Sequence, residues 1–353
     1  MRRVIPLQNF FNSLRLNATT VFVAFISLST TLISTYLVYT DEYDSAVVKF
    51  QHQALTYANN LNHQLERNTQ LIESLAGLFQ ASDKVDRREF RLFTLSHISA
   101  KYHNHHDLQA LEWIPRIKET QRREFEDQAR GAGLEDFQII QNQDGKMIPA
   151  DSRTEYFPVY FSEPMENNLP ILGFDIASTP LCKAALDNAR DTQQMTVSAY
   201  LIIDNGNRPC ERFRILHPIY RNNAPHETTQ QRRDNLLGFV AGLYNLHAMI
   251  DAAISDTPFT DMEFMIYDST NAERKQWLFT HKTHPLSQSQ PVSSPVAEQL
   301  LLSSWLHWQT DIQLPERQWT LEFSPTSAFL ANHGIRWAWF VLGSGLLLTT
   351  VLP

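Results

Sequence analysis

The chain has 353 residues, of which 43% are hydrophobic, and a formal net charge of -8 at pH 7. This length accommodates two domains of modest size. The negative charge argues against a nucleic-acid-binding protein, since no run of lysine and arginine residues offsets it.

An apolar stretch near the N-terminus predicts a transmembrane helix over residues 16–40. The stretch contains no charged side chain, and it is long enough to cross about 30 Å of hydrocarbon as a helix. A cleaved signal peptide is the alternative, but the following sequence V-Y-T-D-E-Y offers no small-residue cleavage motif. Because Arg2, Arg3 and Arg15 precede the stretch, the positive-inside rule predicts that residues 1–15 are cytoplasmic.

A second apolar run follows Arg336 and reads W-A-W-F-V-L-G-S-G-L-L-L-T-T-V-L-P. It is short for a span, and we expect residues 326–353 to form a helix that leads into a second transmembrane helix. Residues 41–335 would then be periplasmic or extracellular, in a multi-pass protein of the cell inner membrane. Because no cytoplasmic segment follows Pro353, we expect the sequence to be the front part of a longer protein.

Residues 41–81 have helical character, with a seam of positions spaced alternately three and four residues apart. The seam consists of Val47, Gln51, Ala54, Ala58, Leu61, Leu65, Asn68, Ile72, Leu75 and Phe79. Such a stalk helix either packs against its own domain or pairs with a second protomer. We expect both, with the membrane-near half dimeric and the far half packed on the domain, and therefore a homodimer.

Beyond the stalk, helical and strand-like segments alternate, and turn-rich sequences separate them. Strands are expected over residues 108–115, 137–141, 156–161, 195–203, 213–220, 236–244, 264–268, 277–280 and 319–323. The polar segment 221–235 is expected to be a surface loop or a connection between two lobes. This mixture predicts an α+β fold.

The segment 173–220 predicts a small-molecule pocket. Asp175 is a lone carboxylate in an apolar, strand-like run, directly before a helix start with Ser178 or Thr179 as the cap and Pro180 in the first turn. An ionised carboxylate in apolar surroundings is costly unless it meets a donor. Asp175 therefore either accepts a structural hydrogen bond from a backbone N–H or anchors a ligand through an amine or exocyclic amino group.

Metal-binding and catalytic patterns are weak. The cluster Y-H-N-H-H-D at residues 102–107 contains three histidines, but loop histidines before a strand are more often solvated, so no metal or other cofactor is predicted. No G-x-S-x-G, P-loop or dinucleotide-binding glycine pattern occurs in residues 41–335. Cys182 and Cys210 lie in the part expected to be exported, where oxidation is permitted, and both a disulfide and two separately buried thiols remain open.

Six motifs follow one another between residues 74 and 244. They are F-Q-A-S, A-L-E-W-I-P-R, Y-F-P-V-Y-F-S-E-P, L-G-F-D-I-A-S-T-P, A-L-D-N-A-R-D-T and H-P-I-Y. In order and spacing they resemble the CHASE domain, the extracellular sensory module of membrane receptors such as histidine kinases, diguanylate cyclases, phosphodiesterases and adenylate cyclases.

The resemblance implies two tandem PAS-like lobes on the long helix. The membrane-distal lobe would comprise residues 82–225 and the membrane-proximal lobe residues 226–325. The expected fold class is therefore α+β, with a long N-terminal stalk helix and two PAS-like lobes bracketed by two transmembrane helices.

The resemblance also implies ligand-binding residues. In the plant cytokinin receptors, which share this domain, an aspartate matching Asp175 contacts the adenine ring, and a threonine matching Thr192 is needed for binding. Much of the intervening pocket differs in this sequence, which leaves a cytokinin-like ligand as a suggestion only. Tyr160 and Ser198 lie on strands expected to flank the same cavity, with core packing as the alternative role for each.

The sequence thus predicts the extracytoplasmic ligand-sensing part of a signal-transduction receptor and no enzymatic activity within this chain. Binding of a small molecule would be passed through the transmembrane helices to a cytoplasmic output domain, a histidine kinase or a cyclic-di-GMP enzyme. One alternative is a membrane-tethered extracytoplasmic hydrolase, which would need a nucleophile–base pair that the sequence does not show. The other is an ectodomain that binds a periplasmic protein.

Overall fold

The computed structural model describes residues 18–82, 84–102, 107–143, 145–165, 171–198, 201–204, 209–255, 261–271, 275–281 and 306–351. The chain divides into two compact units. Unit one comprises Met1–Ala54, Val296–His307 and Ser324–Pro353, and unit two comprises Leu55–Pro295 and Trp308–Phe323.

Helix α2 (Ala18–Ala81) is 64 residues long and contributes to both units. Within the described residues, its segment Val21–Ala81 is the one helix long and apolar enough to cross a membrane by length and composition, whereas Trp337–Thr350 is apolar but shorter. The structure therefore offers one candidate span where the sequence predicted two.

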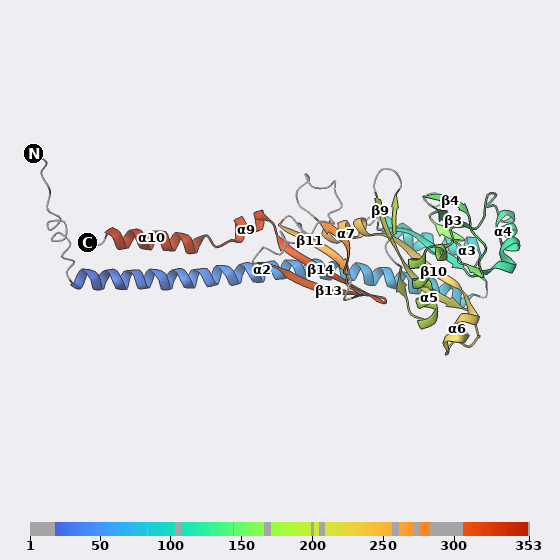
Figure 1. The fold of residues 1–353 in the computed structure, drawn as a ribbon, viewed down its shortest axis with the longest axis horizontal. Coiled ribbons are helices and arrows are strands. Elements are labelled where there is room, and N and C mark those ends of the chain that lie inside the picture. Colours follow the sequence, from blue (N-terminus) through green and yellow to red (C-terminus); the bar gives the residue numbers. More distant parts are fainter. Residues whose placement is uncertain are drawn as a thin grey trace, which may run out of the picture. The chain divides into compact units, whose positions relative to one another are not determined.

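In unit one, the first part of α2 packs against α9 (Ser327–His333) and α10 (Trp337–Val351), which runs alongside it (Figure 1). The rings of Phe50 and Phe329 meet edge to face with their centroids 5.6 Å apart. Farther along, Ser27 Oγ and Thr349 Oγ1 lie 3.1 Å apart. Because α10 begins near residue 42 and ends near residue 27, the two helices are antiparallel.

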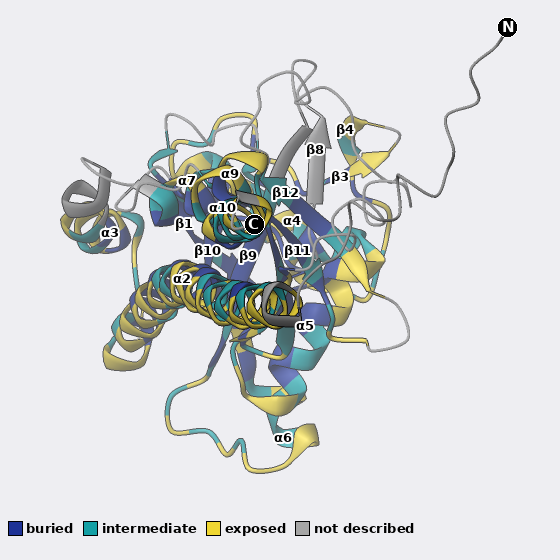
Figure 2. Cartoon of the chain, turned by 90° about the vertical axis from the view of Figure 1, so that its left-hand side faces the viewer, coloured by how far each residue is buried: buried dark blue, intermediate teal, exposed yellow. Residues whose placement is uncertain are grey.

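Unit two contains a six-stranded antiparallel sheet in the order β6-β1-β10-β9-β7, with β8 also paired to β9. Its strands are β1 (Leu108–Pro115), β6 (Phe161–Glu163), β7 (Thr196–Val197), β8 (Leu201–Asp204), β9 (Pro209–Tyr220) and β10 (Leu236–Asn245). We call this sheet and the helices and hairpins around it the first lobe. Figure 2 shows β1, β9 and β10 largely buried and α6 exposed.

The predicted boundary between the lobes at residue 226 is wrong. β10 pairs with β1 along one edge and with β9 along the other, so it occupies the middle of the first sheet. A central strand satisfies the backbone groups of both neighbours, which makes Leu236–Asn245 part of the first lobe. The polar segment before it contains helix α6 (Thr229–Asn235) and connects β9 to β10.

Short elements cover the rest of the first lobe. The helices are α3 (Arg87–Tyr102), η1 (Glu119–Gln121), α4 (Arg122–Gly131), η4 (Ile176–Ser178) and α5 (Pro180–Thr192). Two small ladders join β2 (Ile117–Lys118) to β5 (Glu155–Tyr156) and β3 (Ile140–Gln143) to β4 (Lys146–Pro149).

The second lobe is a four-stranded sheet in the order β12-β11-β14-β13, reached through helix α7 (Leu246–Ser255). Its strands are β11 (Met262–Asp268), β12 (Gln276–His281), β13 (Trp308–Leu314) and β14 (Arg317–Pro325). A long helix followed by two sheet-containing lobes agrees with the predicted α+β class.

The far half of α2 packs on its own unit, as the seam predicted. Every seam position from Ala58 to Phe79 is buried. Tyr57 meets Phe264 of the second lobe at 4.6 Å between ring centroids, and Phe79 stacks on Trp113 of the first lobe at 4.2 Å. One helix thus contacts both sheets of unit two.

Candidate functional site

The first sheet has two faces with different neighbours, because successive side chains on a strand point to opposite sides. Trp113 and Tyr244 point to the face that contacts α2. Residues on the other face, such as Ile114, Ala241 and Leu216, join a buried apolar cluster with α5. We call this second side the α5 face.

A buried ion pair lies on the α5 face. Arg214 Nε is 2.7 Å from Glu112 Oε2, and Arg214 Nη2 is 3.3 Å from Glu112 Oε1. The two side chains are 1% and 0% exposed. The pair spans two strands, since Glu112 on β1 is opposite Ala241 on β10, and Ala241 is opposite Leu216 on β9. The two side chains therefore meet across the intervening strand β10.

Burial lowers the pKa of Arg214, but the attraction of Glu112 outweighs this effect, so the net shift of the pKa is upward. The two parallel N–H···O contacts also give the pair a fixed orientation. The α5 face therefore contains a permanent, oriented pair of charges rather than a purely apolar surface.

Two hydroxyl groups flank this pair. Ser198 is buried, and its Oγ accepts a hydrogen bond of 2.9 Å from the backbone N–H of Arg214. Ser162 is opposite Glu112 in the register of β1 and β6, and its buried Oγ has no hydrogen-bond partner among the described residues. A buried hydroxyl without a partner is costly, which marks this position as one where a ligand or a water molecule would be stabilised.

Asp175 caps helix η4 instead of lying in a strand, and its side chain is fully buried. Oδ1 accepts the backbone N–H groups of Phe157 at 2.9 Å and Ala177 at 3.2 Å, and Oδ2 is 2.5 Å from Arg153 Nη1. Arg153 also donates to Gln141 Oε1. Burial raises the pKa of Asp175, although the N–H of Phe157 and the charge of Arg153 act in the opposite direction.

Tyr160 and Thr192 lie away from both groups of charges. The ring of Tyr160 packs among Phe125, Phe137 and Phe161, with centroids 4.9, 5.8 and 4.6 Å away. Thr192 is exposed at the end of α5, where its Oγ1 donates to the carbonyl of Asn188 at 2.8 Å. Thr192 is the last residue of α5, and Asp175 lies five positions before the first residue of that helix.

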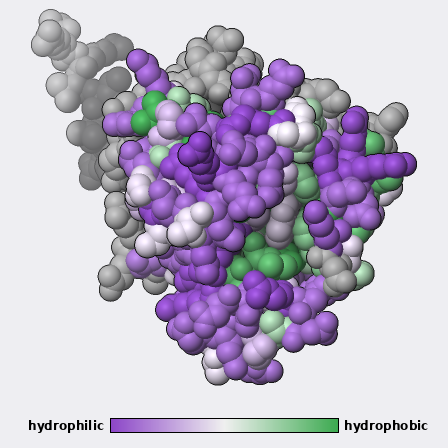
Figure 3. All heavy atoms as spheres, turned by 90° about the vertical axis from the view of Figure 1, so that its right-hand side faces the viewer, coloured by the Kyte–Doolittle hydropathy of each residue, from purple (hydrophilic) through white to green (hydrophobic). Residues whose placement is uncertain are grey.

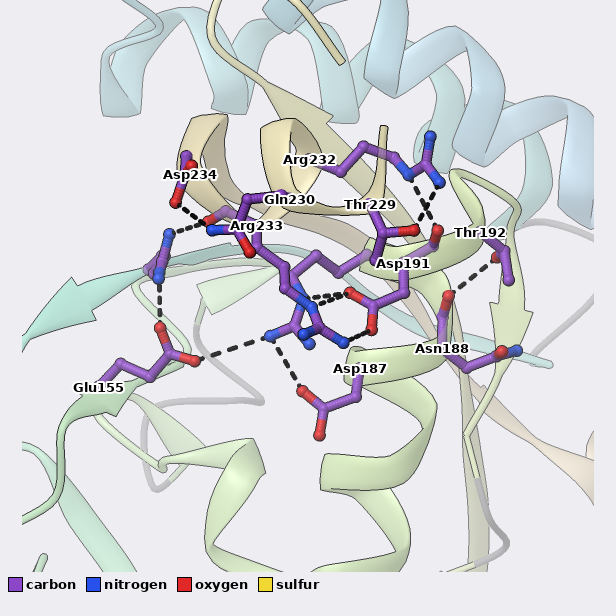
Figure 4. Close-up of polar contacts among 12 residues, drawn as sticks. Glu155, Asp187, Asn188, Asp191, Thr192, Thr229, Gln230, Arg232, Arg233 and Asp234 are labelled. Carbon is purple, nitrogen blue, oxygen red and sulfur yellow. Dashed lines mark hydrogen bonds and ion pairs between the residues drawn. The ribbon is translucent and has the colours of Figure 1, made fainter. Parts of the chain in front are cut away.

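A network of ion pairs ties α5 to α6 and β5 (Figure 4). Asp191 accepts from Arg190 at 2.7 Å and from Arg233 at 3.0 and 2.5 Å. Arg190 also lies 3.0 Å from Asp187 and 3.7 Å from Glu155. The hydrogen bond from Arg233 lowers the pKa of Asp191, and Arg190 adds to the effect against the cost of burial. This network fixes the C-terminal end of the helix that covers the α5 face.

Figure 3 shows the end of the molecule that carries α4 and α6. Hydrophilic side chains dominate this face, and a narrow hydrophobic strip lies recessed between them. A surface of this kind suits exposure to water outside the membrane.

Sequence reasoning missed Glu112, Arg214 and Arg153. The first two lie in the middle of apolar strands, L-Q-A-L-E-W-I-P and R-F-R-I-L-H-P, so the argument applied to Asp175 would also have identified them. Arg153 carried no such signal, because it lies in a polar segment whose path only the fold determines.

The cysteine and metal questions fall partly outside the described residues. Cys182 is a free, buried thiol, and the side chain of Cys210 lies outside the described part. His103, His105 and His106 are also outside it. Asp107 is buried, and its Oδ2 accepts from the amides of Gln64 at 2.7 Å and Asn68 at 3.2 Å. Among the described residues, no group of three or more His, Cys, Asp or Glu side chains could hold a metal ion.

Comparison with known families assigns most of the chain. The CHASE domain matches residues 83–279. The chain belongs to the CHASE domain family. This family consists of extracellular sensory domains of membrane receptors, so the predicted resemblance is confirmed.

Individual relatives are distant from this CHASE-domain chain. Hybrid signal transduction histidine kinase A from Dictyostelium discoideum is 20% identical over 262 residues, which is 70% of this chain and only 12% of that protein. An extracellular ligand binding receptor from Desulfohalobium retbaense is similar with a TM-score of 0.46 and 10% identity, over 78% of this chain and 40% of that one. The ligand-binding domain of the amino acid chemoreceptor PctC from Pseudomonas aeruginosa has a TM-score of 0.44 and 14% identity, over 80% of this chain and all of that one.

Proposed function

We propose that this chain is the extracytoplasmic part of a membrane signal receptor and that it binds a small molecule in the first lobe. The match of residues 83–279 to a family of sensory domains carries the proposal. The buried charges and hydroxyl groups around the α5 face support binding of a polar ligand. Such groups are rarely buried in a structural core, and ligand pockets contain a small number of them.

Asp175 has one acceptor position that its contacts with the described residues do not use. A carboxylate has about four lone-pair positions. Two N–H groups and one guanidinium nitrogen use three of them. The remaining position on Oδ2 can accept from an amine or exocyclic amino group without breaking the contacts already made. The buried Oγ of Ser178, which has no partner among the described residues, lies three residues away in the chain and supplies a further polar atom.

The α5 face is connected to the second lobe through β7. Ser198 adjoins Val197, whose N–H donates to the carbonyl of Pro315 at 3.3 Å and whose carbonyl accepts from Arg317 Nε at 2.9 Å. Phe213 of β9 meets Trp319 of β14 at 5.6 Å between centroids. A ligand that changes the packing around Arg214 and Ser198 would therefore change contacts with the β13–β14 hairpin.

The proposed cytoplasmic output domain is inferred from the membrane topology and from the chain's similarity to a histidine kinase. Two membrane-crossing helices would carry the change to a cytoplasmic histidine kinase or cyclic-di-GMP enzyme. The histidine kinase named among the relatives supports the first of these. Exposed positions on the membrane-near half of α2, such as Val48 and Gln51, leave a surface on which a second copy can pair.

Thermal denaturation of the purified full chain in detergent tests ligand binding. The probe is a panel of amino acids, adenine derivatives and small carboxylates. We expect at least one compound to raise the melting temperature of the wild type and to lose most of that effect on Asp175→Asn, because asparagine keeps an acceptor for Phe157 but lacks the charge.

Asp136→Asn is the matched control, since Asp136 is exposed. Equal stabilisation of Asp175→Asn and the wild type would rule out the anchoring role of Asp175. A panel without any stabilising compound would contradict small-molecule sensing and favour a protein partner.

A further inference from the structure

Unit one contains a pocket between α2 and the segment that joins α9 to α10. Its volume is about 500 Å³. The residues that matter for its chemistry are Asp41, Glu42, Lys49, His333, Arg336 and Trp337. A volume of this size is typical of a small-ligand site.

The pocket lies where polar and apolar surfaces of both helices meet. On α2, the uncharged stretch ends at Thr40, and the first charged residue, Asp41, lines the pocket. On α10, the apolar run begins at Trp337, which is 66% exposed, and continues through Trp339, which is 70% exposed. Because the helices are antiparallel, both apolar segments extend from the pocket in the same direction (Figure 1).

If these segments cross a membrane, as the proposed function requires, the pocket lies at the level of the lipid headgroups. Tryptophan is enriched at this level because its ring is apolar and its N–H is polar. The two exposed tryptophans at the start of α10 fit that position.

Some charged groups in the pocket already form hydrogen bonds with the described residues, and others have unused hydrogen-bonding capacity. The carboxylate of Glu42 accepts the N–H groups of Arg336, Trp337 and Ala338 at 3.3, 2.9 and 3.0 Å, so it caps α10. Arg336 Nη1 donates to the carbonyl of Ala331 at 3.2 Å, and within the described part of the chain most of its other donors are unused.

Three further groups have unused hydrogen-bonding capacity. Asp41 and Lys49 are exposed, and within the described residues neither forms an ion pair. The buried Nδ1 of His333 has no hydrogen-bond partner there. The pocket therefore offers two cations, one carboxylate and one imidazole nitrogen with unused hydrogen-bonding capacity. These groups belong to Lys49, Arg336, Asp41 and His333.

We propose that this pocket binds the headgroup of a phospholipid that carries a phosphodiester and a primary amine. Lys49 and Arg336 would bind the phosphate, and Asp41 would accept from the ammonium group. A lipid bound in this way would contact α2 and α10 together at the point where they leave the membrane. The inference rests on the proposed membrane-spanning role of both helices.

Lipid retention by the purified full chain tests the proposal. The chain is solubilised in detergent, incubated with equal amounts of phosphatidylethanolamine and phosphatidylcholine, washed, and analysed for bound lipid by mass spectrometry. The two lipids share the phosphodiester, but only the first has N–H donors for Asp41. We expect the wild type to retain about fivefold more phosphatidylethanolamine, the preference expected of one well-placed ion pair.

Variants assign the contacts. Lys49→Gln and Arg336→Gln should lower retention of both lipids, and Asp41→Asn should abolish the preference between them. Lys146→Gln is the control, because Lys146 is exposed on the β3–β4 hairpin of the first lobe and should change nothing. Equal retention of both lipids by the wild type, or equal retention by Lys49→Gln and Lys146→Gln, would overturn the proposal.

Two further measurements separate the possible causes of failure. Soluble phosphoethanolamine should not stabilise the chain at concentrations where the lipid does, and equal stabilisation would overturn the assignment to a lipid. Extraction of membranes with alkaline carbonate tests the proposed function independently. A chain released by carbonate contradicts the membrane-spanning role, whereas a chain that stays in the membrane without selecting a lipid contradicts only the headgroup site.

Discussion

Glu112 and Arg214 face each other across the middle of the first sheet with almost no exposed surface. Removing water from two charges is expensive, and their attraction offsets that cost only while both are present. Loss of one partner should therefore destabilise the first lobe more than loss of both.

We predict that Glu112→Met and Arg214→Met each destabilise the chain by about 3 kcal/mol, because each leaves one buried charge without a partner. The double variant should be more stable than either single variant, since it leaves no charge buried. Chemical denaturation monitored by circular dichroism measures all three. Additive losses in the double variant would show that the two side chains do not act as a pair.

At the residue scale, the sequence indicated that charge would be buried but not how it would be neutralised. Asp175 was identified because an acid in an apolar run needs a donor. Its donors, Arg153 and the N–H of Phe157, are 22 and 18 positions away, and nothing local links them to it. Thr192 was identified by resemblance, and its hydroxyl donates to the carbonyl of Asn188 in the last turn of α5.

At the scale of elements, α2 and β10 approach each other closely at Gly242. A Cβ at Gly242 would lie 2.5 Å from a ring carbon of Tyr244 and 2.8 Å from the Cδ1 of Ile72. The hydroxyl of Tyr244 in turn donates to the carbonyl of Asn68 on α2 at 3.4 Å. The absence of a side chain at Gly242 allows the sheet to approach the helix.

Gly242→Ala should therefore destabilise the chain by about 1–3 kcal/mol, the usual cost of overpacking a core. Gly131→Ala is the opposite case, since Gly131 is in α4 and a Cβ there meets no atom within 4 Å. It should stabilise the chain by about 0.5–1 kcal/mol through lower backbone entropy in the unfolded state. Thermal denaturation measures the melting temperatures of both variants. An unchanged melting temperature for Gly242→Ala would contradict the close approach of β10 to α2.

The ion pairs between α5 and α6 should give a measurable pH dependence. The pKa of Asp191 is lower in the folded chain than its ordinary value of 3.8. Its stabilising effect is thus fully present above about pH 5 and is lost as the pH falls through the folded pKa. We expect Asp191→Asn to melt below the wild type at pH 7, with the difference shrinking from about pH 4 downward. A difference that stays constant to pH 2, or one matched by Asp136→Asn, would contradict this.

Element types could be predicted better than strand pairing. The stalk helix, most strands of the two sheets and the helix after Pro180 follow from periodicity and capping residues, whereas β13 (Trp308–Leu314) was not predicted. The assignment of β10 to the second lobe failed because the polar segment before it looks like a domain linker. Pairing depends on which strand edges remain open in three dimensions, and a single strand's periodicity does not reveal this.

For the whole molecule, the proposed topology is a cytoplasmic N-terminus with both lobes outside the membrane. We predict that Lys146→Cys, in a background with Cys182→Ser and Cys210→Ser, reacts with an impermeant maleimide on cells or spheroplasts. Ser13→Cys should react only after permeabilisation. Labelling of Ser13→Cys in intact spheroplasts, or protection of Lys146→Cys, would contradict the topology.

The bond between Glu42 and the first turn of α10 has a mechanical consequence. Three N–H groups meet one carboxylate on the neighbouring helix, and a shift of one residue along the axis moves them by about 1.5 Å. Such a shift would break most of these hydrogen bonds, so the carboxylate of Glu42 resists sliding of α10 along α2. The two helices are therefore expected to tilt or rotate together. Sliding of one past the other would first require the hydrogen bonds of Glu42 to break.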